Sequence, residues 1–145
     1  MRGGKWRLTE FGAALIDMNS QSRPVILVVD DDAAVLNSLT FMLETEGFEV
    51  RALGDVGELL LAETIPDPDC LVVDYRMPVM NGFDVLYWLR DKKVTAPAIL
   101  ITGHPDPKLH ERALAAGFSC VVEKSLLGAT LTAGIREVIA GHRIP

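Results

Sequence analysis

The sequence predicts an α/β fold in which a doubly wound, five-stranded parallel sheet has helices on both faces. Two observations carry this prediction. Short, continuous apolar runs recur along the chain, and the longer segments between them have apolar residues at the helical period. Continuous apolar runs are typical of parallel strands buried on both faces. Strands that alternate with helices imply right-handed crossovers, which place helices on both sides of one sheet.

The strands are predicted first, because their boundaries are the clearest. Apolar runs bounded by polar or turn residues predict strands at Val25–Val29, Cys70–Val73, Ala98–Ile101 and Cys120–Val122. A fifth and weaker strand is predicted at Phe48–Leu53, directly after Gly47.

Helical stripes lie between these runs. In each of these segments apolar residues recur every three or four positions, which predicts one face of a helix. The four segments are Val35–Leu43, Val85–Leu89, Leu109–Ala116 and Leu127–Val138. The helix that contains the second stripe is expected to begin near Asn81. Gly47 and Gly117 are expected to end the first and third helices, since glycine is the usual residue after a helix C-terminus.

Composition limits the class of protein. The chain has 145 residues, about the size of one domain, and is 49% hydrophobic and 23% charged, as is usual for soluble globular proteins. Its 14 Lys and Arg against 20 Asp and Glu give a net charge of −6, which argues against direct binding to nucleic acid. No apolar run approaches the ~20 residues of a membrane span, so we expect no membrane contact and a cytoplasmic protein.

Residues 1–22 form an N-terminal extension ahead of the domain predicted at 23–145. Its apolar residues recur with helical spacing, which fits an amphipathic helix; a disordered extension, or a true start at Met18, accounts for it as well. The apolar part of this segment is too short for a signal peptide. Cys70 and Cys120 show no metal-binding or redox spacing and are predicted to be buried free thiols.

Polar residues follow the predicted strands at their carboxyl ends, where open parallel sheets bind ligands. We therefore expect the following residues to meet at one edge of the sheet: Asp30, Asp31, Asp32, Asp74, Thr102, Gly103, His104, Glu123 and Lys124.

Each of these groups also has a structural explanation. Asp32 directly precedes the first helix and fits an N-cap, and Asp74 fits a turn. Thr102 fits a loop cap, and Lys124 fits a solvated side chain. These explanations leave Asp30 and Asp31 unaccounted for, and they do not explain why all the groups converge on one edge.

The convergence has a chemical explanation. Clustered carboxylates repel one another unless a cation neutralises them, and Mg²⁺ prefers oxygen ligands and recruits phosphate oxygens. A carboxylate beside such an ion can attack phosphorus and form an acyl phosphate. Lys124 would then neutralise phosphoryl charge and Thr102 would donate a hydrogen bond, so that catalysis consists of positioning and charge neutralisation.

The same residues lie in stretches that resemble the receiver domain of two-component response regulators, over roughly residues 24–141. The matching stretches are VILVVDDD (Val25–Asp32), LVVDYRMPVMNGFDVL (Leu71–Leu86), ILITGH (Ile99–His104) and VVEK (Val121–Lys124). The most specific element is D-x-x-M-P-x-x-x-G, from Asp74 to Gly82. The resemblance implies the flavodoxin-like strand order 2-1-3-4-5.

The resemblance also implies a metal site. Asp74 matches the phosphorylated aspartate, and Asp30 and Asp31 match the acidic pair. By this resemblance Asp31 is a direct Mg²⁺ ligand, while Asp30 acts largely through water. Arg76 occupies the position whose backbone carbonyl completes the protein's ligation of the metal.

Thr102 matches the family's switch hydroxyl and Lys124 its phosphate-binding lysine. Arg76 and His104 occupy positions that, by the same resemblance, influence how fast the acyl phosphate is hydrolysed.

Two positions depart from the family pattern. Ser125 stands where the family usually has a proline, often with a cis peptide. Without proline a cis bond costs about 3 kcal/mol, so we expect a trans bond or a differently shaped loop. Val121 stands where the family has Tyr or Phe, so the switch lacks its large aromatic side chain.

The function implied is that of a response-regulator receiver. It would accept a phosphoryl group on Asp74 with Mg²⁺ bound and switch a face used for partner binding or dimerisation. Expected partners are a sensor histidine kinase or phosphotransfer protein, a downstream effector protein or domain, and a second copy of the chain. No enzymatic activity is expected beyond self-catalysed phosphoryl transfer and hydrolysis. The alternative is a constitutive interaction module without a productive phosphorylation switch, which Val121 and Ser125 would allow.

Overall fold

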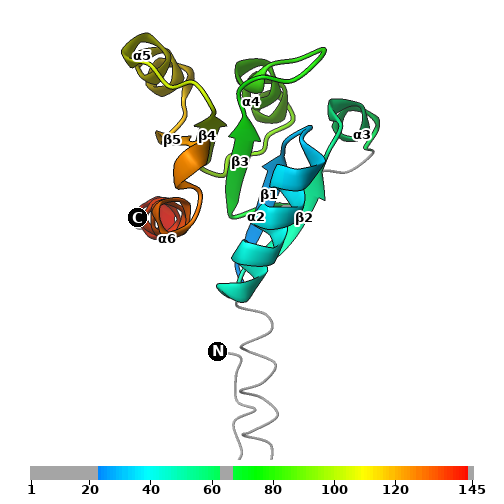
Figure 1. Cartoon of the computed structure of the whole chain (residues 1–145). Coiled ribbons are helices and arrows are strands. Elements are labelled where there is room, and N and C mark those ends of the chain that lie inside the picture. The colour runs from blue at the N-terminus through cyan, green and yellow to red at the C-terminus, as the bar shows by residue number, and fades with distance from the viewer. Residues whose placement is uncertain (1–22, 63–66, 144–145) are drawn as a thin grey trace, which may run out of the picture.

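The computed structural model describes residues 23–62 and 67–143. The predicted N-terminal extension, residues 1–22, lies outside the described residues. One parallel sheet has the strand order β2-β1-β3-β4-β5 (Figure 1), which confirms the predicted fold class and order. Its strands are β1 (Val25–Val29), β2 (Glu49–Leu53), β3 (Cys70–Asp74), β4 (Ala98–Thr102) and β5 (Cys120–Glu123).

The strand ends differ slightly from those predicted. Three strands continue one residue further and end on Asp74, Thr102 and Glu123, so these polar residues keep the strand's alternation of side-chain direction. β2 begins at Glu49, because Phe48 turns into the core and is only 3% exposed.

Helices cover both faces of the sheet, as predicted (Figure 1). α2 (Ala33–Thr45) and α6 (Ala129–Arg143) lie on one face, and α3 (Val56–Leu61), α4 (Gly82–Asp91) and α5 (Pro107–Ala116) lie on the other. A short 3₁₀ helix, η1 (Lys124–Leu126), follows β5, so α6 begins after the predicted Leu127.

The sequence did not single out α3, because its six residues are too few for a periodic stripe. Val56 and Leu59 face the core, whereas Leu61 is 84% exposed. The helix begins where Asp55 accepts a hydrogen bond from the Gly57 backbone N–H at 2.8 Å.

Local signals fix the remaining helix ends. Asp32 is the N-cap of α2 and accepts hydrogen bonds from the Ala34 and Val35 N–H groups at 3.0 and 3.3 Å. Asn81 begins α4, as expected, in a reciprocal capping box with Asp84. Gly117 ends α5 at φ 111°, in the left-handed region that favours glycine.

The apolar core is divided by the sheet. Alternate strand residues such as Leu27 and Val73 pack beneath α3, α4 and α5, while their neighbours such as Val28 and Val72 pack beneath α2 and α6. The strands β3 and β4 are buried along their whole length, which explains their continuous apolar sequences.

Both cysteines are free thiols. Cys70 is buried as predicted, and burial raises the pKa of its thiol to about 12, which makes it unreactive. The prediction was wrong for Cys120, which is only half-buried because it lies on the edge strand β5. Among the described residues, no helix has the length and apolar character needed to cross a membrane.

Candidate functional site

The strand register brings the acidic residues together. Val29 of β1 pairs with Val73 of β3, so Asp30 and Asp74 follow side by side at the carboxyl edge of the sheet. Asp30 is fully buried and Asp74 is 3% exposed, whereas Asp31 is exposed. Ligand oxygens of all three carboxylates lie within 4.8 Å of one another.

Lys124 reaches this cluster from the far edge of the sheet, directly after β5. Its Nζ lies 3.2 Å from Oδ1 of Asp74 and 3.3 Å from Oδ2 of Asp30. Burial alone would lower the pKa of Lys124, but the two carboxylates outweigh burial and raise it. The ammonium therefore carries its positive charge at neutral pH, between two buried anions.

Asp30 has a spare ligand atom. Its Oδ1 accepts a hydrogen bond from the Asp32 backbone N–H at 2.9 Å, which also orients the start of α2. Its Oδ2 is buried and is ion-paired with the Lys124 ammonium at 3.3 Å, but it accepts no hydrogen bond from any described residue. A buried carboxylate oxygen without such a donor, beside two further carboxylates, fits a cation with oxygen ligands such as Mg²⁺.

Asp74 has a shifted pKa. Burial, followed by the nearby charge of Asp30, raises the pKa of Asp74 to about 6, although Lys124 acts in the opposite direction. A carboxylate with this pKa is ionised at neutral pH, but its ionised form lowers the stability of the folded protein. An added cation would offset that loss of stability, which again fits the donor set of the cluster.

Thr102 lies at the end of β4 beside the carboxylates and is 1% exposed. Its Oγ1 accepts a hydrogen bond from the His104 backbone N–H at 3.1 Å, and no described residue accepts a hydrogen bond from its hydroxyl proton. A cavity of about 420 Å³ is lined by Asp31, Asp32, Asp74, Arg76, Thr102, Gly103, His104 and Lys124.

Four of the predicted positions do not line this cavity, namely Asp30, Glu123, Val121 and Ser125. Val121 is half-buried and packs against the apolar cluster beneath α4 and α5. Ser125 is exposed within η1. No peptide bond between described residues is cis, so the Lys124–Ser125 bond is trans, as expected without a proline.

Gly82 has a positional role that its place in the sequence motif did not specify. Its N–H donates to the Tyr75 carbonyl oxygen at 2.9 Å, which brings the start of α4 against the end of β3. A Cβ atom at this position would lie 2.8 Å from the carbonyl oxygen of Asp74. The absence of a side chain at Gly82 therefore permits the backbone around Asp74 to adopt its shape.

The sequence of this domain matches a known family. Residues 26–136 match the family model described as the response regulator receiver domain. The chain belongs to this family. This receiver domain is 35% identical over 114 residues to the transcriptional regulatory protein FixJ of Bradyrhizobium diazoefficiens, covering 79% of this chain and 56% of that protein. It is 37% identical over 128 residues to the response regulator protein TmoT of Ectopseudomonas mendocina, covering 80% and 54%.

Solved structures show the same architecture. A CheY-like response regulator receiver domain from Methanospirillum hungatei superposes with a TM-score of 0.74 at 28% identity, covering 83% of this chain and 96% of that one. A response regulator receiver protein from Burkholderia phymatum gives 0.70 at 30% identity, covering 81% and 96%. The chain thus spans nearly all of these solved chains but only about half of the two curated relatives.

Proposed function

We propose that this receiver domain accepts a phosphoryl group on Asp74 and acts as a phosphorylation-dependent switch in two-component signalling. The observation that carries this proposal is the pairing of a nearly buried carboxylate with an ammonium at 3.2 Å, beside two further carboxylates. The ionised Asp74 needs no general base, because it is already a nucleophile at neutral pH.

The proposed step is a phosphoryl transfer from a phosphohistidine. A carboxylate oxygen of Asp74 forms a bond to phosphorus while the phosphorus–nitrogen bond of the donor breaks. The imidazole keeps the electron pair of that bond and takes up a proton. Lys124 neutralises charge on the phosphoryl oxygens, and the Thr102 hydroxyl donates a hydrogen bond to one of them.

The proposed metal site comprises carboxylates of Asp30, Asp31 and Asp74 and the backbone carbonyl of Arg76. Mg²⁺ held there would supply positive charge to the phosphoryl oxygens and orient them. The cluster has an excess of negative charge that such a cation would offset, since one ammonium pairs with the two buried carboxylates of Asp30 and Asp74 and the exposed Asp31 adds a third. The guanidinium of Arg76 and the side chain of His104 line the same cavity, and we propose that they modulate the lifetime of the acyl phosphate.

The proposed partners are a sensor histidine kinase or phosphotransfer protein as donor and an effector protein or domain, or a second copy of the chain, as output, all in the cytoplasm. Several relatives bear the name of transcriptional regulators, which supports an output in gene regulation for the whole protein. Val121 has no aromatic ring that could change position on phosphorylation. We therefore infer that other side chains transmit the signal from Asp74 to the output partner.

The proposal is tested by intact-mass analysis after incubation with acetyl phosphate. We expect a gain of one phosphoryl mass in the presence of Mg²⁺ and none when a chelator is present. The variant Asp74→Asn should gain nothing, whereas Glu111→Gln, a surface change with the same loss of charge, should gain as much as wild type. Absence of incorporation in wild type, under conditions that label another receiver domain, would overturn the proposal.

Magnesium affinity should depend on pH in a defined way. Because burial and Asp30 raise the pKa of Asp74 to about 6, protons compete with the cation below this value. We expect the association constant, measured by calorimetry, to rise up to roughly tenfold per pH unit below pH 6 and to level off above it. An affinity that does not change between about pH 5 and 7 would contradict the metal site proposed at Asp74.

A further inference from the structure

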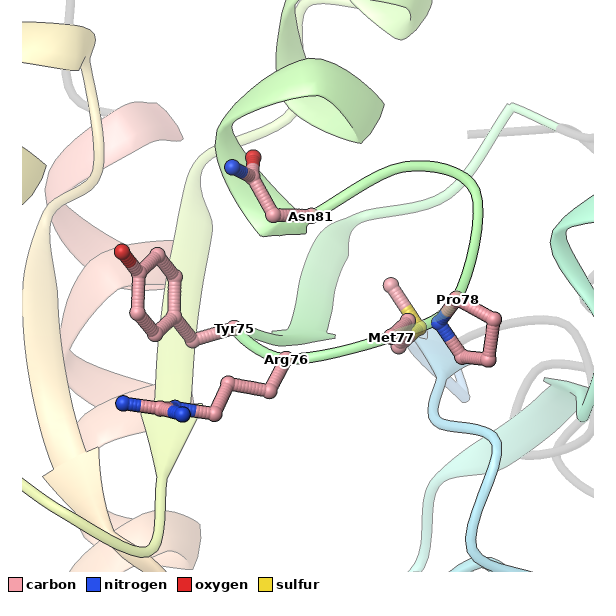
Figure 2. A pocket seen from close by; sticks show the side chains of 5 residues that line it. All are labelled: Tyr75, Arg76, Met77, Pro78 and Asn81. Atoms are coloured by element: carbon pink, nitrogen blue, oxygen red, sulfur yellow. The ribbon is translucent and has the colours of Figure 1, made fainter.

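A second hollow lies on the loop that joins β3 to α4, next to the proposed phosphorylation site. It is a shallow depression of about 560 Å³ that is open to solvent, and it is lined by Tyr75, Arg76, Met77, Pro78 and Asn81. Figure 2 shows the polar ends of Tyr75, Arg76 and Asn81 on one side and the apolar side chains of Met77 and Pro78 on the other. The proposed phosphoryl transfer uses none of these side chains as nucleophile or phosphate ligand, although Arg76 also lines the cavity of the phosphorylation site.

Two walls of this hollow are held rigidly. The ring of Tyr75 packs against Phe83 with centroids 5.3 Å apart, and Phe83 packs in turn against Phe118 at 6.0 Å. Asn81 is fixed by its capping box with Asp84, through hydrogen bonds of 3.0 and 3.1 Å. Such preorganised walls reduce the conformational entropy that the protein loses when a ligand binds.

The apolar side is shaped by a tight turn. The Met80 N–H donates to the Pro78 carbonyl oxygen at 2.8 Å, and Val79 between them has φ 74°. This geometry is a γ-turn with a positive central φ, which is rare, and a β-branched residue there is strained. The turn reverses the chain directly after Pro78, and its strain recurs in proteins mainly at ligand and functional sites.

Arg76 is the one charged wall. Its side chain is exposed, and its guanidinium forms no ion pair or hydrogen bond with any described residue. The Tyr75 hydroxyl is likewise without a hydrogen-bond partner among the described residues. The hollow therefore offers unpaired hydrogen-bond donors, one of them cationic, opposite apolar carbon atoms.

We propose that this hollow binds a small amphipathic carboxylate. The carboxylate would lie on the guanidinium of Arg76, which matches it with two parallel hydrogen bonds, and the apolar body would lie against Met77 and Pro78. This binding does not require phosphorylation, so it goes beyond the proposed function and can fail or succeed independently of it.

The probe for the test is phenylacetate, titrated into the isotope-labelled full chain while amide NMR shifts are followed. We expect saturable shifts centred on residues 75–82, with a dissociation constant on the order of 1 mM for so small a ligand. The alcohol 2-phenylethanol has the same apolar body without the charge and should bind at least about tenfold more weakly.

Two variants complete the test. Arg76→Gln should weaken phenylacetate binding by at least about tenfold. Arg51→Gln removes the same charge from an exposed side chain on the edge strand β2 and should leave binding unchanged. The proposal is overturned if phenylacetate causes no saturable shifts or if the shifts centre elsewhere. It is also overturned if wild type binds 2-phenylethanol as tightly as phenylacetate, or if the Arg76→Gln variant binds phenylacetate as tightly as wild type does. Acetyl phosphate labelling of the same samples reports separately on the proposed phosphorylation.

Discussion

Replacing Asp74 with asparagine is expected to stabilise the metal-free protein at neutral pH while abolishing phosphoryl acceptance. Burial and the charge of Asp30 raise the pKa of Asp74 to about 6, against an ordinary value of 3.8 for an aspartate in an unfolded chain. The folded protein therefore holds a proton that the unfolded chain has already released between these two pH values. Stability falls as pH rises through this window, and the whole destabilisation is present above pH 6.

The size of this effect follows from the shift. The difference between the two pKa values corresponds to at most about 3 kcal/mol. Asparagine keeps the shape of the side chain but carries no charge, and it gives up the pairing with Lys124. We therefore expect a gain of about 1–3 kcal/mol in the free energy of unfolding near pH 8, measured by urea denaturation with a chelator present.

Two comparisons make this prediction specific. The gain should shrink as pH falls from 6 to 4, because Asp74 is protonated in the folded protein over this range and the ionised fraction of the unfolded chain falls as pH nears 3.8. Added Mg²⁺ should stabilise wild type more than the variant, since a ligand stabilises the state that binds it. The surface variant Glu111→Gln should show neither effect. A variant less stable than wild type at every pH would contradict the idea that the carboxylate cluster is repulsive.

The second large effect concerns Gly82. An alanine Cβ at this position would lie 2.7 Å from Cδ1 of Leu100 and 2.8 Å from the Asp74 carbonyl oxygen. The Leu100 side chain is fully buried and the second contact is a backbone atom. Neither can move away from the new Cβ without a large loss of packing or backbone energy. We expect Gly82→Ala to lower the free energy of unfolding by about 2–4 kcal/mol, measured by urea denaturation.

The same substitution should also reduce phosphoryl incorporation, because the clash pushes on the backbone that carries Asp74. Gly134 in α6 is the matched control. A Cβ there would lie 3.7 Å from the nearest side-chain atom, Cδ1 of Ile99, which is an ordinary contact. Gly134→Ala should therefore stabilise the protein by about 0.5–1 kcal/mol, as expected inside a helix. Equal stability of the two variants would show that the close approach at Gly82 carries no energetic weight.

The accuracy of the sequence-based predictions varied with the length and regularity of the pattern. Long stripes and continuous apolar runs predicted all five strands and four of the helices, because burial on the sheet imposes those patterns directly. The short helix α3 was not singled out, since two inward residues, Val56 and Leu59, are too few to show a period. The start of α6 was placed too early, because Leu127 belongs to the connection after η1.

The sequence by itself determined the fold class, the strand order through family resemblance, and the set of residues at the carboxyl edge. These features depend on residue type and spacing, which are read directly from the chain. Only the tertiary structure decided how the residues meet. Strand register sets Asp30 beside Asp74. Lys124 follows β5, and its side chain reaches past β4 so that its Nζ lies 3.2 Å from Asp74.

Three features emerge only in three dimensions: the shifted pKa of Asp74, the burial of the Asp30 oxygen that pairs with Lys124, and the hollow beside Arg76. Each depends on how far the surrounding side chains exclude water and on which charged or hydrogen-bonding groups lie nearby. Residues far apart in the chain supply those neighbours, so no local pattern in the sequence could specify them.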